Sequence, residues 1–389
     1  MLLIGSITVT GILANTLLYP AIPNILDDFG LDDGSAGVLV ASAAVPGIAI
    51  APLVGVLADR YGRRRVLVPC LVAFGCFGAL GAFAPGFWWL VLARLGQGVG
   101  SAGLINLANV LISDTWTGVE RARRFGYNSA VLTVSLAVLP AVGGTLTDLG
   151  GWRWAFAPYP LALITALVVM GRLDHGPMDR STSIGAQARA SARVARSVRV
   201  LAPLSLAFVT FIMIFGLMLT VLPLHLDRVF GLSASERGMV MALPALGATT
   251  GALVLGWIRT RHRARTVVIA AFVLFALAYP VIGLAGTLLL LVPAGVVFGL
   301  GEGIVLPTLT DVVAGSASET SRGAVLSLQV SAIRSGQTVG PLLAGVAVTA
   351  VGTGSTFLLG GALAAMVVIA ALVVRLPPPP LPAVPVDDR

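Results

Sequence analysis

Long apolar runs, separated by short polar loops, fill almost the whole of this 389-residue chain. Each run is long enough to cross about 30 Å of hydrocarbon as a helix, and in lipid only a helix satisfies the backbone of a single segment. The pattern predicts an all-α membrane protein with twelve transmembrane helices. We expect them at 2–25, 35–58, 66–84, 87–112, 125–147, 153–171, 203–226, 236–258, 266–285, 287–312, 322–350 and 355–375.

Polar and glycine positions of the first half recur in the second half at one fixed offset of 201 residues. Pro140 and Gly144 return as Pro341 and Gly345, and the Phe-Gly-Leu sequence at 29–31 returns at 230–232. One offset held over half a chain indicates a duplicated unit. Parallel repeats of membrane helices are typical of transporters, so we expect two six-helix bundles.

The hydropathy pattern divides the chain into four parts. We expect an N-terminal six-helix bundle at 1–171, a basic cytoplasmic linker at 172–202, a C-terminal six-helix bundle at 203–376 and a disordered, proline-rich cytoplasmic tail at 377–389. Arginines recur at helical spacing between 189 and 199, so the linker is either a flexible connection or a short basic helix lying along the membrane. The first apolar run lacks a basic leading segment and a cleavage site, so we expect a retained span and not a signal peptide.

Composition supports a membrane protein and charge sets its orientation. Residues are 57% hydrophobic and 11% charged, with mean hydropathy +0.96, whereas a soluble chain is roughly a quarter charged. All 25 basic residues are arginine; with both termini in the cytoplasm, 20 lie in inner segments, 3 in outer loops and 2 inside spans. This positive-inside bias predicts a multi-pass protein of the cell membrane, here a prokaryotic inner membrane, with both termini cytoplasmic. The net charge of +8 reflects this orientation and indicates no nucleic-acid partner.

The strongest local motif lies between the second and third spans, where the sequence reads Gly-Val-Leu-Ala-Asp-Arg-Tyr-Gly-Arg-Arg-Arg. A glycine there permits a tight reversal, and an acidic residue among cations can pair with a neighbouring loop or cap a helix. Such a contact can form in one conformational state and break in another. The candidate gating residues are Gly55, Asp59, Arg60, Gly62 and Arg64.

This loop resembles the signature of the major facilitator superfamily, and the resemblance extends over nearly the whole chain. In the fourth span, Arg94-Leu-Gly-Gln97-Gly98-Val-Gly matches the family's Arg-x-x-Gln-Gly-x-Gly pattern. Pro140-x-x-Gly-Gly in the fifth span matches the core of the antiporter signature, with Ser and Leu where that signature has further glycines. The eleventh span carries a fuller version, Gly336-x-x-x-Gly-Pro. The match is closest to the drug:proton antiporter branch with twelve spans.

The resemblance implies a set of side chains in the cavity or in helix packing. It implies a coupling role for Arg94 and a helix-packing or cavity role for Gln97. The full set of cavity and packing candidates is Asn15, Gln97, Gly98, Pro140, Gly143, Gly144, Gly340 and Pro341. Some antiporters of the family have Asp in the part of the first span where this chain has Asn15.

Ionisable residues inside spans are costly, so each is a candidate functional group. Arg94, Glu302 and Arg334 are the three candidates, and Glu302 is the one carboxylate expected near mid-membrane. Burial favours the protonated carboxyl group and a nearby arginine favours the ionised one, so movement of Arg334 relative to Glu302 could switch proton affinity. A static ion pair that fixes packing, and contact with a cationic substrate, are the alternatives for Glu302.

The sequence thus predicts a proton-coupled exporter of small amphipathic compounds or drugs, working by alternating access and as a monomer in the lipid bilayer. A dedicated metabolite carrier of the same superfamily is the alternative, and a negative or polar substrate would be favoured if Arg94 and Arg334 both faced the cavity. A non-transporting membrane sensor or enzyme is a remote alternative. The three histidines lack metal-ligand spacing, and we find no phosphate-binding loop or nucleophile–base set. We therefore expect no enzyme activity, no cofactor and no metal.

Overall fold

The structure, a computed structural model, describes residues 1–173, 198–316 and 322–373. Over these residues the chain is helical and has no strand. The elements are α1 (Leu2–Thr16), η1 (Tyr19–Ala21), α2 (Ile22–Asp28), α3 (Ser35–Tyr61), α4 (Arg63–Ala82), α5 (Phe87–Ser101), α6 (Leu104–Thr115), α7 (Gly118–Gly150), η2 (Trp152–Phe156), α8 (Leu161–Arg172), α10 (Val198–Met213), η3 (Ile214–Val221), α11 (Leu222–Arg228), α12 (Ala234–Ala242), α13 (Pro244–Arg261), α14 (Ala264–Leu284), α15 (Leu288–Gly315) and α16 (Arg322–Val373). The linker expectation for 189–196 and the tail at 377–389 lie outside the described residues.

Eleven helical segments of the described chain are long and apolar enough to cross a membrane. The last of them, Ala324–Val373, has 50 residues and is interrupted at Gly352, where the backbone is non-helical with φ 78° and ψ 170°. A span needs only about 20 residues. This segment therefore accounts for both the eleventh and the twelfth predicted spans, and the all-helical membrane fold is confirmed.

The backbone repeats with the same offset as the sequence. Gly30 and Gly231, 201 residues apart, have φ angles of 61° and 64°, and Gly151 and Gly352, again 201 apart, have 80° and 78°. Positive φ is open to glycine at little cost, which is why these turns keep it in both halves. The first span of each half also departs from α-helical geometry, at corresponding places in the repeat. In the first half α1 is followed by the 3-10 helix η1, and in the second half α10 is followed by the π-helix η3.

Several predicted spans differ from the helices found, and the fifth and the eighth show why. The fifth span was expected at 125–147, but α7 begins at Gly118, because Glu120 and Arg124 pair at 2.5 Å along the helix surface and extend the helix past the apolar run. The eighth span is two helices, α12 and α13, which meet at Leu243 just before Pro244. A proline removes a backbone donor and is tolerated best in a first helical turn.

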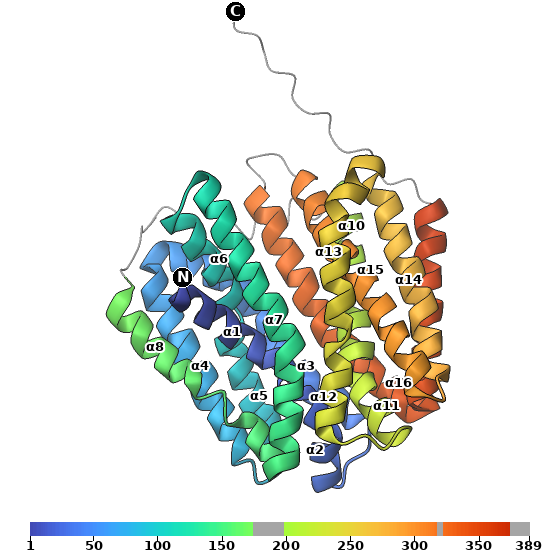
Figure 1. The fold of residues 1–389 in the computed structure, drawn as a ribbon. Coiled ribbons are helices and arrows are strands. Elements are labelled where there is room, and N and C mark those ends of the chain that lie inside the picture. The colour runs from blue at the N-terminus through green and yellow to red at the C-terminus, as the bar shows by residue number, and fades with distance from the viewer. Residues whose placement is uncertain (174–197, 317–321, 374–389) are drawn as a thin grey trace, which may run out of the picture.

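The helices from α1 to α8 lie together on the left of Figure 1, and those from α10 to α16 lie on the right. The two groups meet where α3 packs on α16 and α7 packs on α12. Each group has a buried aromatic core, and its members are repeat mates: Phe74 and Phe156 in the first group correspond to Phe275 and Phe357 in the second. The repeat thus sets the packing of both halves and the interface between them.

Candidate functional site

The interface between the two halves is tightest at one end, which we call the acidic end because it carries Asp27, Asp33 and Asp227. There the helices touch backbone to backbone through glycine. The α-carbon of Gly37 faces the carbonyl of Pro341, and its repeat mate Gly238 faces the carbonyl of Pro140. A side chain at either glycine would overlap the opposite backbone, so each half presents a small-residue face to the other.

The remaining glycines of the two antiporter-like motifs divide between two interfaces. Gly144 lies against the carbonyl of Ala234 across the interface between halves. Gly143 packs on the carbonyl of Leu17 and Gly340 on that of Ile212, each within its own half. The structure therefore places these predicted residues, with Pro140 and Pro341, in close helix packing at and beside the acidic end.

An ion-pair network joins the halves at the same end. Arg228 bonds to Asp27 at 2.6 Å and to Asp33 at 3.0 Å in the first half, and to Asp227 at 3.0 Å in its own half. Arg237, which is buried, bonds to Asp227 and reaches Asn24 across the interface. Sequence reasoning used these residues only to orient the chain. The repeat could have found the central pair, since Asp27 and Arg228 are 201 residues apart.

A second polar contact at the acidic end involves the start of α12. Asp148, on α7, accepts hydrogen bonds from the backbone N–H groups of Ala234 at 3.0 Å and Ser235 at 2.9 Å. These donors have no partner inside their own helix, so a carboxylate satisfies them and also opposes the helix dipole favourably. Ser233 and Glu236 complete a capping box on the same turn. The first half thus caps a helix of the second.

The opposite end, here called the arginine end, carries the predicted gating loop. Gly62 has φ 93° and makes the reversal between α3 and α4, as its position predicts. Asp59 pairs with Arg63 at 2.9 Å; Arg63 also bonds to Asp114 at 2.9 Å and to the carbonyl of Ala58 at 3.2 Å. Arg63, which was not among the candidates, therefore lies at the centre of the loop and joins Asp59 to Asp114.

We expect Arg63→Gln to lower the melting temperature of the purified protein by roughly 5 °C, because the change removes charge-assisted bonds to two carboxylates at once. Arg65→Gln, two residues further on at an exposed position, is the matched control and should melt like the wild type. Thermal unfolding in detergent measures both. Equal melting of the two variants would remove Arg63 from its central place in the loop.

The other residues of the loop have different surroundings. The guanidinium of Arg60 lies 5.6 Å from the ring centre of Tyr61, and Arg64 is half-buried. Gly55 has no neighbour within 4 Å of a built β-carbon among the described residues, and neither has its repeat mate Gly256. The glycines that line the arginine end of these helices are thus open where those of the acidic end are covered.

Polar groups of α5 form a buried cluster near the middle of the first half. Arg94 donates to the side chain of Gln97 at 2.5 Å and to the carbonyl of Ala14 at 3.0 Å, and both side chains are 1% exposed. Within the described chain, the Nε of Arg94, the Nε2 of Gln97 and the hydroxyl of Tyr159 have no hydrogen-bond partner. Gly98, one turn away, packs on the carbonyl of Ala43 in α3. The side chain of Asn15 lies outside what the structure describes.

Arg334 and Glu302 are not brought together. Arg334 donates to Gln337 at 3.0 Å, and its side chain lies against Gly47 of α3, across the interface between halves. Glu302, on α15, forms no ion pair with Arg334 or with any other described residue, and the buried Tyr279 of α14 lies near it. The two groups thus lie apart in this state, on different sides of the C-terminal half.

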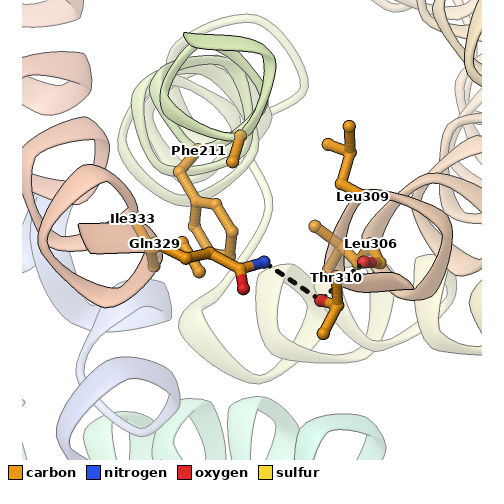
Figure 2. Close-up of a pocket in the computed structure, with 7 residues that line it drawn as sticks. Phe211, Leu306, Leu309, Thr310, Gln329 and Ile333 are labelled. Atoms are coloured by element: carbon orange, nitrogen blue, oxygen red, sulfur yellow. Dashed lines mark hydrogen bonds between the residues drawn. The ribbon is translucent and has the colours of Figure 1, made fainter. Parts of the chain in front are cut away.

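A small cavity lies between α10, α15 and α16, and Figure 2 shows side chains from all three helices around it. Its volume is about 70 Å³, and Gln329 donates to the hydroxyl of Thr310 at 3.2 Å across it. Leu306 and Leu309 line the cavity and lie four and seven residues after Glu302, on the same helix face. Because drug-sized pockets are about 300–1,000 Å³, this cavity has room only for water or a small apolar group.

The chain forms two repeated helical halves that pack on each other through glycine faces and carry buried charges. This arrangement defines a membrane transporter. A family model described as Major Facilitator Superfamily matches residues 4–235 and again residues 204–388. The chain belongs to this superfamily, whose members are transporters and not enzymes.

Curated relatives include drug-efflux proteins of bacteria. The chain is 28% identical over 335 residues to the class B tetracycline resistance protein of Escherichia coli, covering 84% of this chain and 83% of that protein. It is 26% identical over 376 residues to the class D protein of Salmonella ordonez, covering 93% and 94%. A bacterial homologue of the human lysosomal transporter Spinster, solved inward-facing and occupied, has the same fold at 19% identity and a TM-score of 0.78, covering 95% of this chain and 94% of that one. The chain is therefore a multi-pass membrane transporter similar to drug-efflux proteins.

Proposed function

We propose that this protein is a proton-coupled exporter of small amphipathic compounds, working by alternating access in a prokaryotic inner membrane with both termini in the cytoplasm. The bundles at 1–171 and 203–376 rock against each other, and the substrate binds between them. Similarity to tetracycline resistance proteins over more than four-fifths of the chain supports export of a small molecule. The bias of arginine toward the linker side of the membrane supports the orientation.

One observation carries the alternating-access part of the proposal: among the described residues, the contacts that join the two halves most closely gather at the acidic end. At the acidic end, Gly37 and Gly238 are covered by the opposite half, and Arg228 and Arg237 bond across the interface. At the arginine end, Arg259 pairs with Asp311 at 3.2 Å within the second half, and a built β-carbon at Gly55 or Gly256 meets no described residue within 4 Å. This closure of the acidic end supports the proposal that the protein is seen in an inward-facing state.

The same geometry suggests how the protein switches. The contacts of the acidic end are polar or involve small residues, so they can separate without exposing a large apolar surface. Gly55 and Gly256 at the arginine end are free to receive the opposite half when that end closes. Closing requires the loop held by Asp59 and Arg63 to dock on the other half, so this loop would set the balance between the two states.

Coupling to protons requires a group that gains and loses a proton at different stages of the cycle. Glu302 fits this requirement, since its carboxylate lies in a span and has no cationic partner among the described residues in this state. Movement of α16 during switching would bring Arg334 nearer and favour release of the proton. The cavity of Figure 2 lies one helical turn from Glu302, at about 6 Å, toward the arginine end, and offers a place for water to deliver or remove that proton.

A susceptibility panel in a host stripped of its own efflux pumps tests the function. We expect the wild-type protein to protect against several unrelated amphipathic compounds and Asp59→Asn, at matched membrane expression, to lose at least about tenfold of that protection, since it loses the pair with Arg63 that orders the loop. Glu120→Gln, which alters only the pairs of Glu120 with Arg123 and Arg124 along the surface of α7, is the control and should protect like the wild type. Protection against no compound would favour a dedicated metabolite carrier.

A further inference from the structure

Two arginines inside the membrane lack a carboxylate partner in the described part of the chain. Arg94 bonds only to the side chain of Gln97 and to a backbone carbonyl, and Arg334 bonds only to the side chain of Gln337. Neutral amide oxygens do not neutralise a guanidinium. Unpaired charge in a low-dielectric interior is costly, so such groups persist where something else supplies the opposite charge.

Both arginines border the same stretch of α3. Gly98, one turn after Arg94, packs on the carbonyl of Ala43, and the Arg334 side chain lies on Gly47, one turn further along α3. Tyr19, at the break in the first span, is electrostatically coupled to both guanidinium groups. The two positive charges thus flank one region between the halves, one charge from each half.

Hydrogen-bonding capacity in this region is biased toward donors. The Nε of Arg94 and the Nε2 of Gln97 are buried N–H donors without a hydrogen bond of good geometry in the described chain, and the hydroxyl of Tyr159 lies close to both residues. Arg334 is half-buried, and its side chain lies at the interface against Gly47 of the other half. Buried donors normally have partners, and a set without acceptors fits a ligand that brings oxygen acceptors.

The negative groups that could compensate these charges are engaged or turned elsewhere. Asp27, Asp33 and Asp227 are held by Arg228 at the acidic end, and Asp148 caps α12. Glu302 forms no ion pair with Arg334. The region between the two halves is therefore positive in this state.

We propose that the substrate is an amphipathic molecule with an anionic group, and that this group binds between Arg94 and Arg334 at the interface between the halves. This inference rests on the proposed export function and specifies its substrate class. Bonds from both halves to one anion would also link substrate binding to their relative position, since Arg94 and Arg334 move with different bundles.

Equilibrium binding to two dyes with one scaffold tests the proposal. Fluorescein is an anionic xanthene dye, and rhodamine 123 is a cationic one. Fluorescence anisotropy measures the binding of each dye to purified protein in phosphatidylcholine nanodiscs, where there is no proton gradient and no anionic lipid. We expect fluorescein to bind at least about tenfold more tightly than rhodamine 123. Arg334→Gln should weaken fluorescein binding by about tenfold or more, while Arg334→Lys, which keeps the charge, should retain most of it.

Controls separate this proposal from the export function. Arg123→Gln removes an exposed arginine of α7 and should bind fluorescein as the wild type does. Arg94→Gln provides a second test in the other half, with size-exclusion chromatography to check that it folds. Three results would overturn the anionic-substrate proposal, even if rhodamine 123 is exported. They are tighter binding of rhodamine 123 than of fluorescein, no binding of fluorescein, and unchanged fluorescein binding in both Arg334→Gln and Arg94→Gln. Charge-dependent fluorescein binding without transport would instead uphold the substrate class and contradict the export function.

Discussion

Glu302→Gln should abolish export driven by a pH gradient while leaving substrate exchange in place. Glutamine has the shape of a protonated glutamate but cannot release a proton, so the carrier can still change state with substrate bound and cannot use the gradient. The experiment reconstitutes wild type and variant in liposomes and compares substrate accumulation under an imposed pH gradient with exchange at equal pH. The variant's accumulation should fall to that of protein-free liposomes.

Asp311→Asn is a suitable control for this result, because Asp311 lies on the same helix as Glu302 but pairs with Arg259 at the arginine end. It should still accumulate substrate when the gradient is applied. Normal gradient-driven accumulation by Glu302→Gln would take Glu302 out of the coupling mechanism. Loss of exchange together with accumulation would indicate that the residue binds substrate or maintains packing.

Gly238→Ala should push the protein out of the state seen here and open its acidic end. The added methyl group would meet the backbone of Pro140, which cannot move aside as a flexible side chain could. Overpacking of this kind costs about 1–3 kcal/mol, which corresponds to a shift of roughly 5- to 150-fold in the balance between states. Accessibility of Ala234 replaced by cysteine, a residue that is buried against Gly144 of the other half in this state, measures the opening as faster thiol labelling from the acidic side in a background lacking Cys70 and Cys76.

Gly256→Ala is the matched control, on the same pair of helices but at the arginine end, where a built β-carbon meets no described residue within 4 Å. It should leave labelling at position 234 no faster than in the wild type. Equal labelling of Gly238→Ala and the wild type would mean that the glycine contacts do not determine closure of the acidic end.

Hydropathy and the repeat predicted the fold well, because lipid leaves a spanning chain few alternatives to the helix. The same 201-residue offset that relates Pro140 to Pro341 in the sequence relates the backbone angles of Gly151 to those of Gly352. Helix ends were less accurate where polar residues decide them. The start of α7 depends on pairing between Glu120 and Arg124, which hydropathy does not register.

Pairings within the candidate site were harder to foresee, because they depend on the state that the protein occupies. Glu302 and Arg334 lie on consecutive spans, yet the structure does not pair them; Arg334 instead reaches Gly47 on the other half. Arg63 looked like one of several membrane-anchoring arginines, and only the fold shows that it joins Asp59 to Asp114. Contacts between halves, such as Arg228 with Asp27, are likewise set by tertiary geometry.

Distances across both ends of one molecule test alternating access most directly. Spin labels at Phe83 and Leu284, exposed repeat mates at the acidic end, and at Tyr61 and His262, exposed repeat mates at the arginine end, report opening and closing by double electron–electron resonance in the cysteine-free background. Adding substrate or changing pH should lengthen the Phe83–Leu284 distance as the Tyr61–His262 distance shortens. Distances that stay fixed, or that change at both ends in the same direction, would contradict the account.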